Sequence, residues 1–586
     1  MIPDLPRILA AFRHRVLLLC GALLACVSLT ACGWLGPGMR PRVRNVIVMV
    51  PDGSSQSIQT LARWYKGGAL NLDGLNSGTA KTFMADSIIT GSAAAATAFA
   101  TGHKTSARFL GIGPRTDDLL TGFKPTAAPY EPVASVLEAA KLQGKAVGLV
   151  AVSRISHATP AAFGSHVRDR DLEEQIMEQL VYQDLDVAFG GGAGYLIPRH
   201  SACTTSFGAR WQGVRSDRDN LLAVLRARGV QWVDDKAGLA AVTQGPVWGL
   251  FSPGHMDPQM DKSADSTQPS LADMTAKAIE ILSRNPRGFF LMVEGSQVDW
   301  GAHGNDPAYM VTEYLAFDEA VGRALAFART DGRTSVYIWP DHNTGGLTIG
   351  NAATFFPPGY PVAEDRRPVY TATSVESLVA PLRRMKISAG ALARRISDPN
   401  DDARVKAALL TYWGIQASDE DLRQIRKLSR LKTGNGRSLG LAYALGEVIS
   451  RNHLIIGWTS HGHCGEDVPV WSYGPLPMTG TFDNTELARM AARALGVDLA
   501  GATGRLYVDL SSITKSYSID RRDAANPGIV IGADIVLPAD RDILWIAGKA
   551  HRLDGIVVFA PMAGGGAGKV FVPRDAADRI RNYLSQ

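Results

Sequence analysis

The chain has 586 residues, 46% of them hydrophobic and 20% charged, which is the composition of a globular protein with ample apolar surface to bury. The 60 glycines and 31 prolines are spread along the chain, which excludes a collagen-like or disordered protein. Five cysteines in so long a chain exclude a disulfide scaffold. With 61 Lys and Arg against 56 Asp and Glu, the net charge of +5 is too small to indicate a nucleic-acid partner.

The first 31 residues have the pattern of an export signal. Three arginines form a positive N-terminal region, and an apolar run over residues 16–29 follows it. The run ends in Leu29-Thr30-Ala31-Cys32, which resembles the lipobox of bacterial lipoproteins, whose cysteine is acylated and becomes the mature N-terminus. We therefore expect a lipoprotein signal peptide over 1–31 and a tether over 32–43. A plain cleaved signal peptide and a short membrane anchor are the alternatives.

Lipidation at Cys32 would anchor the exported protein to a membrane without a transmembrane helix. Acyl chains contribute about 0.8 kcal/mol per buried CH₂ group, so several chains together form a stable anchor. The residue after Cys32 is Gly33 and not the aspartate that usually retains lipoproteins in the inner membrane. We therefore expect an outer-membrane location facing the periplasm.

Five short apolar runs recur along the chain, with helical patterns between them. Such continuous runs are typical of strands that are buried on both faces of a parallel sheet. We therefore predict an α/β fold with a parallel-rich central sheet flanked by helices. The runs cover residues 45–50, 146–152, 289–293, 335–339 and 453–458.

Carboxylates, histidines and hydroxyl groups come directly after these runs. In open α/β sheets the ligand lies beyond the carboxyl ends of the strands, so the five clusters should meet at one edge. A single cluster would be explained by a helix cap after a strand, whereas five that converge indicate a metal site. The candidate ligands are Asp52, Thr159, Glu294, Asp299, His303, Asp341, His342 and His463.

The residue types indicate which metals the site suits. Two aspartate–histidine pairs, Asp299 with His303 and Asp341 with His342, offer the mixed ligands that Zn²⁺ accepts. Two metals about 3.5–4 Å apart would stabilise the attacking and leaving oxygens of a phosphoryl transfer. An all-oxygen set suits Mg²⁺ and comprises Asp52, Thr159 and Glu294.

Ser92 begins an alanine-rich helical segment, residues 92–105. A serine at such a position is commonly only a helix N-cap. A helix N-terminus also offers backbone N–H groups and a positive potential to an anion, which suits a nucleophilic serine in phosphoryl transfer. Both interpretations of Ser92 stay open from this segment alone.

Taken together, these segments resemble the alkaline phosphatase family over residues 44–515. The resemblance implies that family's α/β fold and hydrolysis of phosphate monoesters through a phosphoserine on Ser92. The segments that match in order are Ser92–Ala98 with Thr101-Gly102, His157–Ala162, Val293–Gly295, Asp299–His303, Asp341-His342 and His463–Val468.

The resemblance also implies a role for each ligand. Arg170 would grip two phosphate oxygens, for which a guanidinium has the right fork geometry. Two zinc ions and one magnesium ion are implied as cofactors. The first zinc would be bound by Asp299, His303 and His463, the second zinc by Asp52, Asp341 and His342, and the magnesium by Asp52, Thr159 and Glu294.

Two positions depart from the best-known bacterial pattern of the family. Gly91 stands where many members carry an aspartate that can hold the phosphate-binding arginine, so we expect Arg170 to keep more rotamer freedom in the empty site. His157 stands where some members carry an aspartate near the magnesium, which leaves occupancy of that third site open.

The remaining segments outline the domain organisation. Residues 44–342 and 455–515 would form the catalytic core, with a helical insertion over 343–454 that includes a basic helix at 418–431. That helix is either a solvated face or a surface for anionic substrates or lipid headgroups. Residues 516–586 predict a small β-rich extension of unknown role.

The function that these observations favour is metal-dependent hydrolysis of small phosphorylated substrates, with release of inorganic phosphate. A phosphodiesterase of the same superfamily and a catalytically idle surface-binding lipoprotein are the alternatives. A sulfatase is disfavoured because the chain has no Cys-x-Pro-x-Arg nucleophile motif. Pairing of Cys203 with Cys464 and the oligomeric state stay open.

Overall fold

The computed structural model describes residues 43–351, 374–433, 436–523, 526–560 and 568–586. The predicted signal peptide, the lipidation site Cys32 and most of the tether lie outside these residues. Among the residues that the structure describes, no helix is both long enough and apolar enough to cross a membrane.

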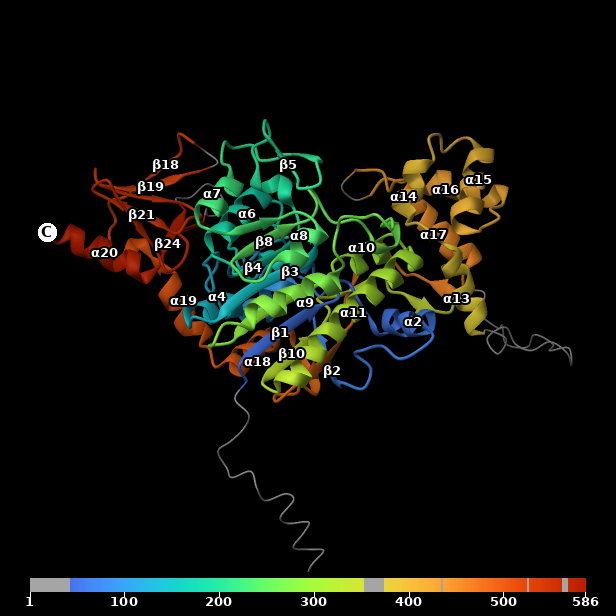
Figure 1. Ribbon diagram of the computed structural model, residues 1–586, viewed down its shortest axis with the longest axis horizontal. Coiled ribbons are helices and arrows are strands. Elements are labelled where there is room, and N and C mark those ends of the chain that lie inside the picture. The colour runs from blue at the N-terminus through green and yellow to red at the C-terminus, as the bar shows by residue number, and fades with distance from the viewer. Residues whose placement is uncertain (1–42, 352–373, 434–435, 524–525, 561–567) are drawn as a thin grey trace, which may run out of the picture. The chain divides into compact units, whose positions relative to one another are not determined.

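A sheet of ten strands forms the centre of the protein (Figure 1). Four of the predicted apolar runs are neighbours in it and run parallel, with β1 (Asn45–Val50) between β9 (Phe289–Glu294) and β10 (Thr334–Ile338), and β3 (Ala146–Arg154) beside β9. Among the described strands of this sheet, the antiparallel pairs are the two that β15 forms, with β10 and with β2. The other strands are β16 (Gly480–Asp483), β2 (Asn76–Lys81), β15 (Val468–Tyr473), β4 (Val187–Gly191), β8 (Val247–Leu250) and β7 (Gln231–Val233).

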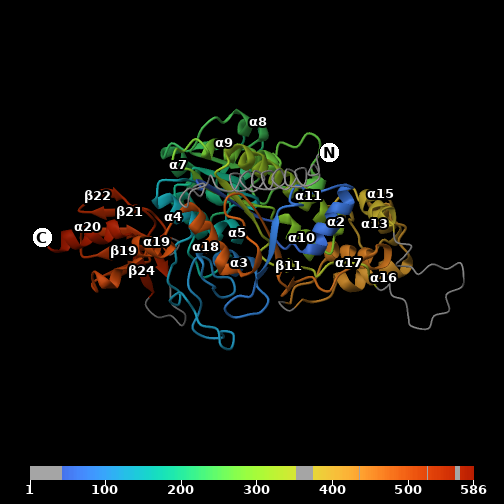
Figure 2. The same ribbon diagram turned by 90° about the horizontal axis from the view of Figure 1, so that it is seen from below.

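Helices cover both faces of this sheet (Figures 1 and 2), because its strands carry apolar side chains on both faces, as β1 illustrates. Ile47 and Met49 pack into one core, and Val46, Val48 and Val50 pack into the other, because successive side chains of a strand point to opposite faces. The first core is closed by α2 (Gln56–Lys66), α9 (Leu271–Leu282) and α11 (Pro307–Asp331), and the second by α3 (Ser92–Thr101), α4 (Val136–Leu142) and α18 (Asn484–Leu495). The predicted α/β fold is confirmed.

The fifth predicted run, residues 453–458, is not a strand of the central sheet. Its first residue ends helix α17 (Leu441–His453), and β13 (Ile456–Gly457) pairs with β12 (Thr348–Ile349), outside the central sheet. The sheet strand of this region is β15, which follows the His463 cluster instead of preceding it. Pro469 lies inside β15, and a proline within an apolar run argues against a strand when only the sequence is considered.

The described residues between 374 and 453 are mostly helical. Two arginines of the basic helix α16 (Asp419–Ser429) are paired with carboxylates, Arg423 with Glu420 and Arg426 with Asp402. This pairing favours a solvated face over an anion-binding surface. The other helices are α13 (Val375–Arg384), α14 (Ala389–Arg395) and α15 (Asp402–Trp413).

The C-terminal segment forms two small antiparallel sheets and a helix, with an apolar core of its own. One sheet has five strands in chain order, and the other places β24 between β17 and β23. The elements are β17 (Val508–Asp509), β18 (Ser518–Asp520), β19 (Gly528–Ile531), β20 (Ile535–Pro538), β21 (Ile543–Ile546), β22 (Lys549–Arg552), β23 (Val558–Ala560), β24 (Lys569–Val572) and α20 (Arg574–Leu584).

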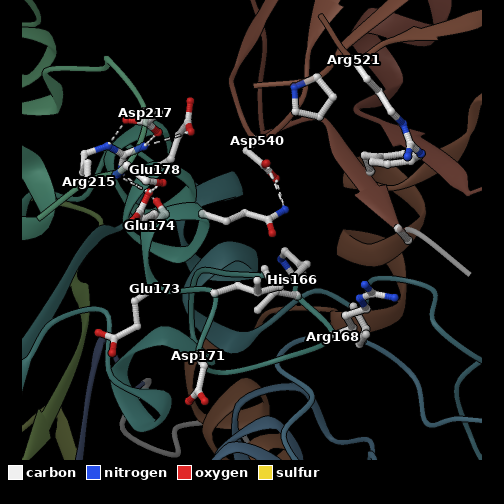
Figure 3. Close-up of a pocket in the computed structure, with 18 of the residues that line it drawn as sticks. His166, Arg168, Asp171, Glu173, Glu174, Glu178, Arg215, Asp217, Arg521 and Asp540 are labelled. Carbon is white, nitrogen blue, oxygen red and sulfur yellow. Dashed lines mark hydrogen bonds and ion pairs between the residues drawn. The ribbon is translucent and has the colours of Figure 1, made fainter. Parts of the chain in front are cut away.

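Buried polar contacts join this segment to helix α6 (Glu173–Tyr182) of the core. The carboxylate of Asp540 accepts hydrogen bonds from the side-chain amides of Gln175 and Gln179, and Arg541 pairs with Glu178. Asp540 and Arg521 face His166 and Glu174 across a cavity of about 560 Å³ (Figure 3). None of the predicted metal ligands lines this cavity.

Candidate active site

The predicted metal ligands lie at the carboxyl ends of the parallel strands, as the sequence analysis expected. Asp52 comes two residues after β1, Glu294 ends β9, and Asp341 with His342 follows β10. Asp299 and His303 lie on the short helix α10 (Gln297–His303). His463 reaches the same edge because β14 (His463–Cys464) pairs with β11 (Asn343–Thr344).

The first ligand group consists of Asp299, His303 and His463, whose ligand atoms lie within 4.8 Å of one another. Nε2 of His303 is 3.1 Å from Nε2 of His463 and 3.4 Å from Oδ2 of Asp299. Nδ1 of His303 donates to the carbonyl oxygen of His461, and Nδ1 of His463 donates to the carbonyl oxygen of Thr90. Since each Nδ1 carries the ring hydrogen, both Nε2 lone pairs are free for a metal.

The second ligand group consists of Asp52, Asp341 and His342, all buried. Nε2 of His342 is 3.1 Å from Oδ2 of Asp341 and 3.7 Å from Oδ1 of Asp52. Burial and the neighbouring carboxylates of Asp341 and Asp299 raise the pKa of Asp52 well above its usual range. The ring of His342 stacks on that of His463 with 3.6 Å between centroids, so the two groups are adjacent.

The third ligand group contains Asp52, Glu294 and also His157. Burial raises the pKa of Glu294 to about 7, and Thr159 lies beside its carboxylate. The sequence marks His157 only as a departure from the family pattern, whereas in the structure a ring nitrogen of His157 lies within 4.8 Å of a carboxylate oxygen of Asp52 and one of Glu294. Its position two residues before Thr159 was the available signal.

The structure decides between the two roles considered for Ser92. The N-cap of α3 is Gly91, and Ser92 is the first helical residue, so its hydroxyl is not needed as a cap. Oγ of Ser92 lies 3.2 Å from Nε2 of His342, in the second ligand group. Ser92 is therefore placed as a nucleophile would be, at a helix N-terminus and against the metal ligands.

The expectation that Arg170 is unrestrained in the empty site is wrong. Nη2 of Arg170 donates to Nε2 of His157 over 2.7 Å. Burial and the charge of Arg170 hold the pKa of His157 well below its usual range, so the ring is neutral and can accept this hydrogen bond. The imidazole at position 157 thus supplies the restraint that the missing carboxylate at Gly91 would have given.

The pairing of two cysteines was left open by the sequence. Cys464 follows the ligand His463, and Cys203 lies on β5 (Ala202–Thr204). Both are free thiols, so the pairing that the sequence left open is not formed.

A parallel sheet whose carboxyl edge carries three adjoining groups of carboxylates and imidazoles defines a metal-dependent α/β enzyme. The model of the alkaline phosphatase family matches residues 43–497. The chain therefore belongs to the alkaline phosphatase family, whose members are metal-dependent enzymes that hydrolyse phosphate monoesters.

Individual relatives support this membership. The chain is 33% identical to alkaline phosphatase 4 of Bacillus subtilis over 480 residues, covering 78% of this chain and 89% of the relative. It is 35% identical to alkaline phosphatase of Escherichia coli over 357 residues, covering 51% and 70%. Among solved structures, Thermus thermophilus alkaline phosphatase superimposes with a TM-score of 0.65 at 26% identity, covering 78% of this chain and 92% of that one.

Proposed function

We propose that this protein hydrolyses phosphate monoesters through a phosphoserine on Ser92, with zinc in the first and second ligand groups and magnesium in the third. The observation that carries the proposal is a set of buried polar atoms that have no hydrogen-bond partner among the described residues. They are both carboxylate oxygens of Asp52, Oδ2 of Asp341, Oε1 of Glu294 and Oγ1 of Thr159.

Bound cations would satisfy these atoms. A buried polar atom without a hydrogen-bond partner costs about 1–3 kcal/mol, and more if it is charged. Several such atoms in one place therefore point to a missing ligand. The carboxylates and imidazoles of the first two groups are donors that zinc accepts, and the oxygens of the third group suit magnesium. When bound, the cations would stabilise negative charge on the reacting oxygens.

The protein's own residues supply the covalent chemistry and the binding of substrate. Oγ of Ser92 would form a bond to phosphorus as the bond to the leaving alcohol breaks, and water would then cleave the phosphoserine and release inorganic phosphate. Arg170 uses one of its five N–H groups on His157, which leaves a fork free for two phosphate oxygens.

Metal removal and replacement test the proposal. The protein dialysed against a chelator should lose hydrolysis of a phosphate monoester, and zinc with magnesium should restore it, with the metal content of each sample measured by elemental analysis. Full activity in a sample shown to contain no metal would contradict the assignment of all three groups. His303→Ala, which removes one ligand, should recover far less activity at the same zinc concentration.

The identity of the third metal can be tested separately. The solved structures include a histidine-to-aspartate variant of the phosphatase from the Antarctic bacterium TAB5 with magnesium bound in its M3 site. In this chain, His157→Asp would add an oxygen ligand to the third group, so we expect magnesium to bind more tightly to the variant than to the wild type. Equal magnesium affinity would mean that residue 157 does not contribute to that group.

We further propose that the protein is exported and anchored to the outer membrane through lipid on Cys32, facing the periplasm. The support is the positive region, the apolar run and the lipobox-like sequence at the N-terminus.

A further inference from the structure

Helix α17 of the insertion contacts the first ligand group through a histidine that is not itself a ligand. Nε2 of His461 lies 2.9 Å from Oε2 of Glu447, which is on α17. Nδ1 of the same ring lies 2.7 Å from the carbonyl oxygen of His303. Both ring nitrogens of His461 therefore face oxygen acceptors, and this fixes the orientation of the ring.

The contact between His461 and His303 is reciprocal. The ring of His461 donates to the backbone of His303, and Nδ1 of His303 contacts the carbonyl oxygen of His461. The second contact holds the ring of His303 with Nε2 toward Asp299 and His463. A displacement of His461 would therefore rotate or release a metal ligand.

A hydrogen bond and a close backbone approach also hold α17 next to the turn that follows His303. Oγ of Ser450 donates to the carbonyl oxygen of Asn305 over 2.8 Å. A Cβ atom at Gly446 would lie only 2.0 Å from the carbonyl oxygen of Gly304, so glycine permits a close approach of the two backbones. Glu447 lies between Gly446 and Ser450 in the sequence, and its carboxylate is also 3.2 Å from Arg451.

We propose that Glu447 is a positioning residue for the first ligand group. Through His461, it holds His303 in the orientation that binds zinc, and so the insertion sets the zinc affinity of Asp299, His303 and His463. The second ligand group has no such contact with α17 among the described residues, and its affinity is independent of Glu447. This inference rests on the proposed binding of zinc by the first group.

The expected size of the effect follows from the position of Glu447 one hydrogen bond beyond a residue that orients the ligand. Removal of such outer partners of ligating histidines commonly weakens metal affinity 10- to 100-fold. Glu447 lies one hydrogen bond further out than these partners, so we expect Glu447→Ala to weaken zinc binding at the first group by about 10-fold, the lower end of this range. Glu447→Gln keeps a side-chain oxygen that can accept from His461, so we expect a smaller loss, below 10-fold.

The experiment is a zinc titration of the full chain in competition with a chelator of known affinity. The wild type should show two tight sites, and His303→Ala identifies which binding step belongs to the first group. Glu420→Ala is the matched control, because Glu420 is an exposed glutamate of the neighbouring helix α16 whose partners, Arg423 and Gln424, belong to the same helix. The control should bind zinc as the wild type does.

Selective weakening of the first-group step in Glu447→Ala, with a smaller effect in Glu447→Gln, supports the inference. Wild-type affinity at both sites in Glu447→Ala overturns it. Equal weakening of both sites also overturns it, because that would reflect general destabilisation of the fold. If the wild type itself binds no zinc at the His303 step, the proposed function fails, and that result is separate from either outcome for Glu447.

Discussion

Replacing His157 with alanine should weaken inhibition of the enzyme by inorganic phosphate. In the empty site Nη2 of Arg170 donates to Nε2 of His157 over 2.7 Å, so the guanidinium is already oriented before phosphate arrives. Without the imidazole, Arg170 would sample more rotamers in the free enzyme. Phosphate binding would then have to order the side chain again.

The size of the effect follows from the entropy of a long side chain. Fixing an arginine costs up to about 2 kcal/mol in rotamer freedom, and a single hydrogen bond restrains a large part of it. A loss of about 1–2 kcal/mol in phosphate binding corresponds to an inhibition constant roughly 5- to 30-fold higher.

The assay is a phosphate inhibition constant for wild type and His157→Ala under identical pH and metal concentrations, with metal content measured for both proteins. His255→Ala is the control, since its ring packs against His157 at 5.6 Å between centroids and contacts Arg154, not Arg170. An unchanged constant in His157→Ala, or an equal increase in the control, would refute the reasoning.

Gly91→Asp completes the test as a double-mutant cycle. A Cβ atom at Gly91 meets only the ring of His463, at 3.8 and 3.9 Å, so a side chain is tolerated there. Because His157 already restrains Arg170, we expect Gly91→Asp to tighten phosphate inhibition by less than about 3-fold in the wild type, and by more when His157 is absent. Equal effects in both backgrounds would show that the two positions do not restrain the same group.

Three other predictions follow. Ser92→Ala should lower the rate by several orders of magnitude and remove the phosphoenzyme while leaving zinc content unchanged, and acid quenching with labelled substrate should place the label on the wild-type peptide that contains Ser92 and on no other. Cys32→Ser should block lipidation, so the protein should leave the membrane fraction or accumulate as precursor, and mass spectrometry that finds an unmodified N-terminus at another residue would contradict the anchor. Burial raises the pKa of Glu313 to about 7 in the folded protein. The free energy of unfolding therefore falls as pH rises from the pKa of this glutamate in the unfolded chain to its folded pKa. Glu313→Gln should therefore stabilise the metal-loaded protein by up to about 3 kcal/mol in urea unfolding at pH 9 and much less at pH 5, and equal effects at both pH values would contradict this origin.

The sequence predicted the metal ligands because the rule for parallel sheets brings distant residues to one edge. Asp52, Glu294 and Asp341 are far apart in the chain, and each follows a strand whose apolar run is unmistakable. His463 was predicted by the same rule from the run at 453–458, which is not a strand of the central sheet, and it reaches the edge because β14 pairs with β11. The fold class was predictable on the same grounds.

Contacts between side chains that share no motif could not be predicted. The hydrogen bond from Arg170 to His157 depends on the path of the loop between them, and no spacing rule specifies it. Glu447 is one acidic residue among several in a charged insertion, and only the packing of α17 against Gly304 brings it to His461. Both depend on tertiary geometry, which periodicity and composition do not encode.

The docking of the C-terminal segment on α6 has a consequence for the order in which the protein can fold. The last strand of the central sheet, β16, ends at Asp483, so the whole sheet is encoded before the C-terminal segment is synthesised. The hydroxyl of Tyr507 is a partner of buried Glu138, and Asp540 is a partner of buried Gln179. An incomplete chain that ends before these residues leaves that glutamate and that amide each with one fewer hydrogen-bond partner in the interior, although His166 still contacts both. The part of the chain that is made last therefore adds hydrogen bonds to groups buried in the core, and we expect a protein cut at residue 497, the boundary of the family match, to be less stable than the full chain.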